Sequence, residues 1–227
     1  MQKKELGRLG IPDDRISTIP MGIDEEFLER GEYRRRELKK GRFTILSNRN
    51  LLPIYNVSLL IRAIPMVLKE EPDTKFLIAG EGAEKEALER EVKNLNIYSS
   101  VKFLGRIPHE EMPDILSKAD IYVSTSLYDG TSVSLLEAMG SGAFPIVTDI
   151  PPNREWIVPG ENGFLVPVNE EKLLAKKIVD AIRDRALLER SRKENHSLIE
   201  QRVLWSVSIE KITKMYSQLS VDLRGGE

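Results

Sequence analysis

The stretch Tyr128–Met139 reads YDGTSVSLLEAM and joins two contrasting patterns. It follows the apolar run Ile121–Val123, which is typical of a buried strand. From Val133 onward, apolar residues recur at the spacing of a helix. The stretch therefore predicts a buried strand, a short loop and a helix, which together form the basic unit of an α/β fold.

The loop of this unit carries small and hydroxyl-bearing residues, Gly130, Thr131 and Ser132. Gly130 is expected to let the backbone turn and approach a ligand closely. The two hydroxyl groups can cap the helix or donate to an anion. Because a helix N-terminus presents free N–H groups and partial positive charge, we expect a phosphate to bind here.

Two acids, Asp129 and Glu137, flank the loop and the first turns of the helix. Their separation is about two helical turns, so both carboxylates can line one pocket. A carboxylate repels a phosphate but accepts hydrogen bonds from sugar hydroxyl groups. The pair favours a sugar-nucleotide site, although a loop aspartate and a glutamate on a solvated helix face fit the same spacing.

Strands and helices alternate through the rest of the chain. We expect strands at residues 43–47, 76–79, 101–104 and 121–124, with helices between them. The helix after Asn56, a plausible cap, contains Pro65, which predicts a kink. The alternation predicts an α/β, Rossmann-like domain of three layers, with a mainly parallel sheet and helices on both faces. Ligands of such a sheet bind at the carboxyl ends of its strands.

The two ends of the chain differ from this middle part. Residues 1–40 are charged and lack a core pattern, so we expect a linker there and the nucleotide-sugar-binding domain at 41–204. Bases gather in residues 30–42, where a solvated helix face is favoured over a patch for an anionic lipid or acceptor. Residues 169–200 predict two helices, the first capped by Asn169. Residues 205–227 predict a last helix, with an apolar stripe that needs a partner surface, and a tail from residue 224 that frays.

The composition excludes several classes of protein. The 227 residues are 41% hydrophobic, which suffices for one good core. A net charge of −2 gives no reason to expect nucleic acid as a partner. Without cysteine there is no disulfide framework and no cysteine–metal site. No apolar run approaches the length of a membrane span and no signal peptide opens the chain, so we expect a cytoplasmic location.

Common catalytic motifs are also absent from the sequence. Gly80 and Gly82 follow the second expected strand and lack the third glycine of a dinucleotide fingerprint, which argues against a dehydrogenase. There is no P-loop and no nucleophile elbow. His109 and His196 have no nearby histidine partners for a metal cluster, and His109 is expected at the surface. No Asp-x-Asp pair follows a strand, so the sequence shows no carboxylate pair that could bind a metal ion together with a diphosphate.

The acid pair belongs to a longer pattern. The run Asp129–Gly142, with the segments Pro145–Asp149 and Asn162–Val166, resembles the family-4 retaining glycosyltransferases of the GT-B fold. The resemblance extends over about residues 8–205 and implies the C-terminal half of a GT-B enzyme, which binds a nucleoside diphosphate sugar without a metal cofactor. It implies a missing N-terminal half that binds a glycan, lipid or small-molecule acceptor. It also implies that the full-length enzyme makes peripheral contact with the inner face of a membrane.

The same resemblance assigns roles to individual residues. Asp129 and Arg49 are the expected catalytic residues, with Asp129 binding hydroxyl groups of the donor sugar and Arg49 stabilising the leaving diphosphate. Glu137 is expected to bind the ribose hydroxyl groups. The remaining residues expected to bind the substrate, several through their backbone, are Gly130, Thr131, Ser132, Gly105, Arg106, Ile107, Gly80 and Gly82.

The sequence departs from the family pattern near Arg49. Tyr55 stands where the family has a lysine, so a positive charge is missing there. Arg154 is one candidate to replace it, and nearby Trp156 is expected to be a packing residue. Asp129 replaces the usual glutamate and has a shorter reach. Two alternatives to a glycosyltransferase therefore stay open: a non-catalytic sugar-nucleotide-binding module, and a GT-B relative such as a sugar-nucleotide epimerase.

Overall fold

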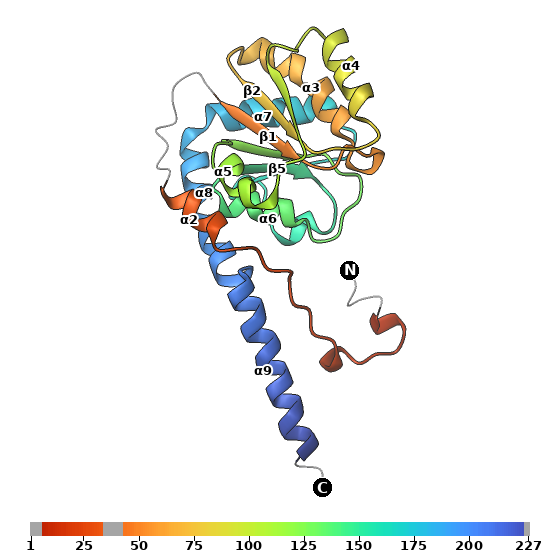
Figure 1. Ribbon diagram of the computed structural model, residues 1–227, viewed down its shortest axis with the longest axis vertical. Helices are drawn as coiled ribbons and strands as arrows, with labels where there is room; N and C mark the ends of the chain where they lie inside the picture. The colour runs from red at the N-terminus through yellow and green to blue at the C-terminus, as the bar shows by residue number, and fades with distance from the viewer. Residues whose placement is uncertain (1–5, 34–42, 225–227) are drawn as a thin grey trace.

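The computed structural model describes residues 6–33 and 43–224 (Figure 1). Its centre is a six-stranded sheet in which every pairing is parallel and the strand order is β3-β2-β1-β4-β5-β6. The strands are β1 Thr44–Asn48, β2 Lys75–Ala79, β3 Val101–Gly105, β4 Ile121–Ser124, β5 Phe144–Thr148 and β6 Phe164–Val166. The predicted Rossmann-like α/β fold with a parallel sheet is confirmed.

Helices connect successive strands and lie on both faces of the sheet. The α-helices are α2 Glu26–Tyr33, α3 Val57–Glu70, α4 Lys85–Asn94, α5 Met112–Leu116, α6 Val133–Gly140, α7 Glu171–Arg183, α8 Arg185–Arg202 and α9 Trp205–Arg224. Short 3-10 helices are η1 Asp13–Arg15, η2 Pro53–Tyr55, η3 His109–Glu111 and η4 Asn153–Glu155.

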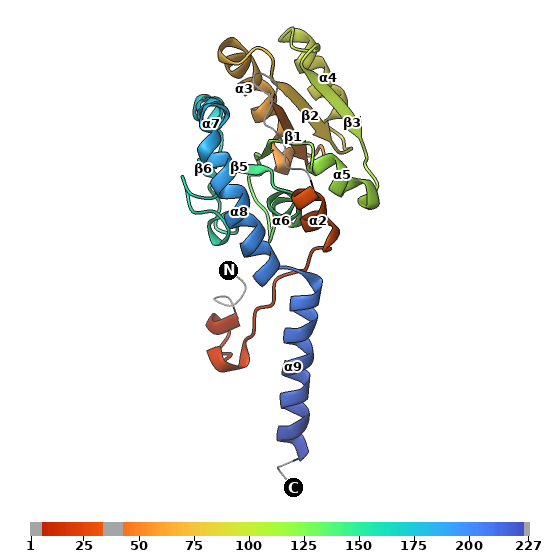
Figure 2. The ribbon, with the colours of Figure 1, turned by 90° about the vertical axis from the view of Figure 1, so that its left-hand side faces the viewer.

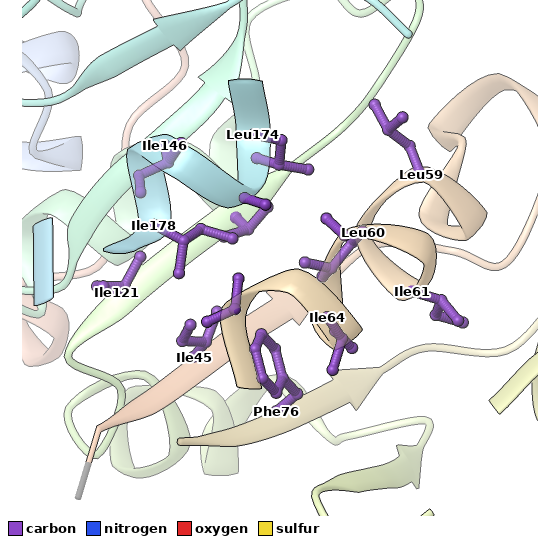
Figure 3. Packing of buried hydrophobic residues seen from close by; sticks show 14 of the residues in the cluster. Ile45, Leu59, Leu60, Ile61, Ile64, Phe76, Ile121, Ile146, Leu174 and Ile178 are labelled. Carbon is purple, nitrogen blue, oxygen red and sulfur yellow. The ribbon is translucent and has the colours of Figure 1, made fainter. Parts of the chain in front are cut away.

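One face of the sheet is covered mainly by α3 and α7, which pack against each other (Figure 3). Leu60 of α3 and Ile178 of α7 are buried together with strand residues in the centre of this layer. The strand residues that share this cluster include Ile45, Phe76, Ile121 and Ile146. Because successive side chains of a strand point to opposite faces, the next residue along a strand belongs to the other layer.

The opposite face of the sheet carries α2, α5, α6 and the C-terminal part of α8. Leu46 and Tyr122, which follow Ile45 and Ile121, are buried in this second cluster. The two clusters give the chain the three layers expected from the sequence. They also place the loop before α6 at the carboxyl ends of the strands, where ligands bind in such sheets.

The segment before residue 41 contributes to the second cluster. Ile23, Phe27 and Leu28 are buried there, with Phe27 on α2 fully covered. The backbone of Ile23 also bonds to Val203 and Trp205, so the segment before α2 meets the junction of α8 and α9. Part of the segment expected to be a linker is therefore packed in the core. The predicted basic face at 30–42 lies, beyond Arg30, mostly outside the described residues.

Two expected helix caps are wrong. Asn56 and Asn169 precede α3 and α7, but both have left-handed backbones, with φ of 47° and 63°. Neither side chain caps its helix. Instead, Asn56 Nδ2 donates to Asn169 Oδ1 at 3.1 Å, which links two segments far apart in the sequence. Pro65 lies inside α3, which continues to Glu70.

The last helix, α9, projects from the α/β body in both views (Figures 1 and 2). Its apolar side chains Trp205, Ile209, Ile212 and Tyr216 are exposed. Its own domain therefore does not cover these four residues, and a neighbouring molecule as the partner surface of the stripe stays a prediction. Arg224 is the last residue of the helix, and the rest of the tail, 225–227, lies outside the described residues.

A side-chain cap holds the start of α8. Asp184 accepts a hydrogen bond from the backbone N–H of Leu187 at 2.8 Å. We expect Asp184→Ala to lower the free energy of unfolding by about 1 kcal/mol, because the N–H loses its acceptor. Asp184→Asn keeps an acceptor and should retain most of that stability, which urea unfolding followed by circular dichroism can measure. If Asp184→Ala and Asp184→Asn lower the free energy of unfolding equally, the charge of Asp184 stabilises the helix and its hydrogen bond to Leu187 does not.

Candidate functional site

A cavity of about 450 Å³ opens at the carboxyl ends of the strands. Its walls come from the loops after β1, β2 and β3 and from the start of α5. The lining residues are Asn48, Arg49, Asn50, Ala79, Gly80, Glu81, Arg106, Ile107 and Met112. Four of the residues expected from the sequence, Arg49, Gly80, Arg106 and Ile107, therefore share one cavity.

Arg49 is the most constrained cation of this cavity. Its side chain is only 9% exposed, and its Nη2 forms an ion pair with Asp129 Oδ2 at 2.5 Å. Nη1 donates to Ser132 Oγ at 3.1 Å, and the guanidinium carbon lies 4.3 Å from the centroid of the Tyr55 ring. The Nε group is buried and has no hydrogen-bond partner among the described residues. Arg49 thus retains one buried hydrogen-bond donor that is not used within the described residues.

The loop before α6 supplies the partners of Arg49. Asp129 also accepts a hydrogen bond from the N–H of Gly130 at 2.9 Å through its other oxygen. Ser132 occupies the N-cap position, but its side chain makes no cap bond and accepts from Arg49 instead. Gly130 is not among the glycines with positive φ, and a Cβ there would meet open space. The turn therefore does not require glycine conformationally, and Gly130 and Thr131 remain exposed.

Glu137 lies about one turn into α6 and is buried, with 6% exposure. Its Oε1 is 3.9 Å from Nδ1 of His109. His109 in turn contacts Oδ2 of Asp24 through Nε2 at 3.0 Å and packs its ring beside Phe27. The expectation that His109 is a simple surface residue was incomplete, because its exposed ring joins Asp24 to the buried carboxylate.

The charges of this group influence one another. Burial raises the pKa of Glu137 above its ordinary value, the His109 charge opposes that increase, and Asp24 adds to it. The hydrogen bond to Asp24 raises the pKa of His109, partial burial opposes the increase, and the Glu137 charge adds to it. A protonated His109 therefore offsets part of the cost of an ionised, buried Glu137.

The glycines after the strands shape the cavity through their lack of a side chain. A Cβ on Gly80, whose φ is +138°, would lie 2.2 Å from the carbonyl oxygen of Arg49. A Cβ on Gly82 would lie 2.2 Å from the carbonyl oxygen of Leu51. Gly80 and Gly82 thus let the loop after β2 pack on the loop that carries Arg49, and Gly82 does not line the cavity. Gly105 ends β3 with φ of +71°.

Only some of the residues expected at the site line the cavity. The loop 105–107 reaches the cavity through Arg106, which is exposed, and through Ile107, which is half-buried. The other expected residues do not line it: Gly105, Asp129, Gly130, Thr131, Ser132 and Glu137. Arg154, a candidate replacement for the family lysine, pairs instead with Asp149 at 2.6 Å. Trp156 is buried, as expected for a packing residue.

Sequence reasoning missed two contacts at this site. Tyr55 was identified only as a missing charge, and its contact with Arg49 was not anticipated. The approach of His109 to Glu137 and Asp24 was also missed, because the three residues are far apart in the sequence. The position of His109 just after the loop 105–107 was the available signal, since that loop was already expected at the site.

Within residues 6–33 and 43–224, no group of three or more His, Asp or Glu side chains is placed to hold a metal ion. Over the same residues, every helix is too short or too polar to cross a bilayer.

The family described as Glycosyl transferases group 1 matches residues 29–217. A similar curated protein is the GPI3 subunit of phosphatidylinositol N-acetylglucosaminyltransferase of Saccharomyces cerevisiae. It is 25% identical over 219 residues, which are 94% of this chain and 48% of that protein. The GtfA subunit of a UDP-N-acetylglucosamine–peptide N-acetylglucosaminyltransferase of Limosilactobacillus reuteri is 28% identical over 218 residues, 92% of this chain and 40% of that protein. The chain thus spans about half or less of these relatives.

Solved structures share the fold. Anabaena HepE in complex with UDP superposes with a TM-score of 0.81 at 20% identity, over 95% of this chain and 61% of that one. The C-terminal domain of LpcC from Francisella tularensis, a glycosyl transferase group 1 family protein, gives a TM-score of 0.68 at 25% identity. That match covers 79% of this chain and 97% of the LpcC domain. With its parallel sheet, its acid pair at α6 and a match over residues 29–217, the chain belongs to the glycosyl transferases group 1 family of the GT-B fold.

Proposed function

We propose that this chain is the donor-binding half of a retaining glycosyltransferase, which takes a sugar from a nucleoside diphosphate sugar. The observation that carries the proposal is the position of Arg49 at the cavity, buried and held against Asp129 at the mouth of α6. A fixed guanidinium at the cavity suits the diphosphate, and the carboxylate beside it suits sugar hydroxyl groups.

The proposed arrangement extends from the cavity to the adjacent N-terminal part of α6. The base lies against the loop 105–107, the ribose hydroxyl groups bond to Glu137, and the diphosphate lies between Arg49 and the N-terminus of α6. Asp129 exchanges its ion pair with Arg49 for hydroxyl groups of the donor sugar. Retention of the anomeric configuration and independence of a metal are inferred from the resemblance to family 4.

Transfer requires an acceptor held beside the donor, and holding two reactants in place supplies a large share of rate acceleration. The LpcC match is to a C-terminal domain, and the chain covers only 40% to 48% of the relatives above. We therefore propose that an N-terminal half binds the acceptor, and that these 227 residues alone bind the donor without transferring its sugar. A cytoplasmic location and a peripheral membrane contact of the full-length enzyme stay predictions.

The absence of a lysine at Tyr55 supports a second candidate, a sugar-nucleotide-binding module without activity. Turnover by the two-domain protein separates the two functions. A binding module releases no nucleoside diphosphate when donor and acceptor are both present. An epimerase, in contrast, converts the sugar nucleotide without an acceptor.

Binding of nucleotides to the 227-residue chain is the first test. We expect isothermal titration calorimetry to detect UDP, GDP or ADP, and the matching sugar conjugate, at concentrations below about 1 mM, corresponding to more than about 4 kcal/mol of binding free energy. Arg183→Ala is a suitable control, because Arg183 is an exposed arginine paired with Glu70 and Glu71 on α3 and its flank. The control should bind as the unaltered chain does. If none of the nucleotides binds at millimolar concentration, the proposed function is wrong.

A further inference from the structure

Arg49 is held by three groups from two parts of the chain. Asp129 and Ser132 hold it from the loop before α6, and Tyr55 holds it from η2, six residues after Arg49 in the sequence. The distance of 4.3 Å from the guanidinium carbon to the ring centroid is within the range of a cation–π interaction. Tyr55 itself is half-buried and packs against the first core cluster, so its ring has a fixed support.

These contacts differ in what happens when a sugar nucleotide binds. Under the proposed function, Asp129 turns to hydroxyl groups of the sugar and its ion pair with Arg49 weakens. The ring of Tyr55 is not a hydrogen-bond acceptor that the ligand competes for. It remains against the guanidinium while the N–H groups of Arg49 turn to phosphate oxygens.

We propose that Tyr55 is a positioning residue that holds Arg49 toward the diphosphate, at the position where the family pattern has a lysine. The expected effect on nucleotide binding rests on the proposed function. The orientation of Arg49 by the Tyr55 ring rests on the contact itself. The aromatic ring is the required feature. The hydroxyl group of Tyr55 is not.

The backbone around Tyr55 is held in a defined conformation, which supports a positioning role for its ring. Asn56, the next residue, has a left-handed φ of 47°, a conformation that residues other than glycine seldom adopt. The Oγ1 group of Thr125 donates to the carbonyl oxygens of Tyr55 and Asn56, at 3.1 and 2.8 Å. The segment is therefore anchored to the loop after β4, and the ring has a defined place over Arg49.

The test compares aromatic and aliphatic variants of the 227-residue chain. Tyr55→Phe and Tyr55→Trp are expected to bind UDP as the unaltered chain does. Tyr55→Leu and Tyr55→Met should bind UDP about 3- to 30-fold more weakly, the range of a cation–π contact. Their affinity for uridine, which has no diphosphate, should not change. GDP and guanosine replace this pair of probes if GDP is the nucleotide that binds.

A double-mutant cycle excludes a general structural effect. In an Arg49→Ala background, Tyr55→Leu should cause no further loss of UDP affinity, because the ring has nothing left to position. Unchanged UDP affinity in both aliphatic variants overturns the proposal. So does a loss that persists without Arg49, or a Phe variant as weak as the Leu variant.

A readout without nucleotide separates this inference from the proposed function. The Nε–Hε signal of Arg49 in a ¹⁵N–¹H spectrum should be sharp and slow to exchange in the unaltered chain and in Tyr55→Phe. It should broaden and exchange rapidly in Tyr55→Leu and Tyr55→Met. If no nucleotide binds, the proposed function fails while this signal still decides whether Tyr55 positions Arg49. An unchanged signal in both aliphatic variants overturns the positioning role.

Discussion

Arg49→Ala is expected to lower sugar transfer by the two-domain enzyme about 10²- to 10³-fold, the usual effect of removing one fixed donor to developing charge. Charge on the departing diphosphate grows as the bond to the sugar breaks. A cation that is already oriented stabilises this transition state more than it stabilises the bound substrate. The fall should therefore appear mainly in kcat, with a smaller change in KM.

The position of Arg49 is the structural reason for this prediction. Its guanidinium is buried at the cavity wall, where it is proposed to exchange the ion pair with Asp129 for phosphate oxygens without moving away from the site. Binding of the nucleoside alone should be nearly unchanged, because the base and ribose are proposed to contact the loop 105–107 and Glu137. Steady-state kinetics and calorimetry with UDP and uridine measure the two effects separately.

Two further variants control for the change of charge. Arg183→Ala removes an exposed arginine remote from the cavity and should leave transfer unaltered. Arg49→Lys keeps the charge but cannot form the ion pair, the bond to Ser132 and the aromatic contact in the same geometry. We expect it to recover only part of the activity. A rate of transfer in Arg49→Ala close to that of the unaltered enzyme would remove Arg49 from the catalytic machinery.

The strands were the part of the fold that the sequence predicted best. The central strands of a parallel sheet are buried on both faces, so they appear as continuous apolar runs such as Ile121–Val123. Predicted strand limits agree with the structure to within one residue for β1 to β4. Because the strands are parallel, the loops after them were expected at one edge of the sheet. The family resemblance then assigned Arg49 and Asp129 to one site, and the structure joins them in an ion pair.

The packing of the N-terminal segment was hidden by its composition. Phe27 and Leu28 lie among acidic neighbours, and a helix as short as α2 presents only one or two apolar turns. Its burial depends on α6 and α8, which come more than a hundred residues later. No local pattern contains that information.

The contacts that orient the site are also long-range. Asn56 bonds to Asn169, and His109 bonds to Asp24, across 113 and 85 positions of sequence. A local rule assigns each asparagine to a helix cap and the histidine to solvent. Tertiary contacts override these local preferences, since the same polar groups find better partners across the fold.

Glu137→Gln is expected to weaken binding of UDP by about 1.5–3 kcal/mol, or about 10- to 150-fold, because charge-assisted bonds to two ribose hydroxyl groups are lost. The substitution keeps the size of the side chain, so packing inside α6 is preserved. The ribose itself offers the matched control. The unaltered chain should prefer UDP to 2′-deoxy-UDP, and Glu137→Gln should abolish most of that preference.

Glu137→Gln, which is expected to weaken UDP binding, should stabilise the chain in the absence of nucleotide. Burial raises the pKa of Glu137 in the folded chain, despite the opposing charge of His109. When the pKa of a group is higher in the folded chain than in the unfolded chain, the group contributes fully to stability only below its unfolded pKa, here about 4.3. That contribution is lost as the pH rises through the folded pKa. At neutral pH the ionised, buried carboxylate therefore destabilises the free chain, and Glu137→Gln should raise the Tm. The gain should disappear below about pH 4, where the carboxyl group is protonated in both states.

A buried carboxylate that lowers the stability of the free protein, as Glu137 should, is expected where its charge is needed for binding. Glu86→Gln, which neutralises an exposed glutamate on α4, should change neither the Tm nor the preference for the ribose. Thermal unfolding at pH 4 and pH 7, with and without UDP, tests both effects in one series. A higher Tm together with unchanged UDP affinity would make Glu137 a buried charge without a role in binding. A variant that fails to fold would make it a structural residue, and only a Tm gain with lost discrimination between UDP and 2′-deoxy-UDP supports the ribose contact.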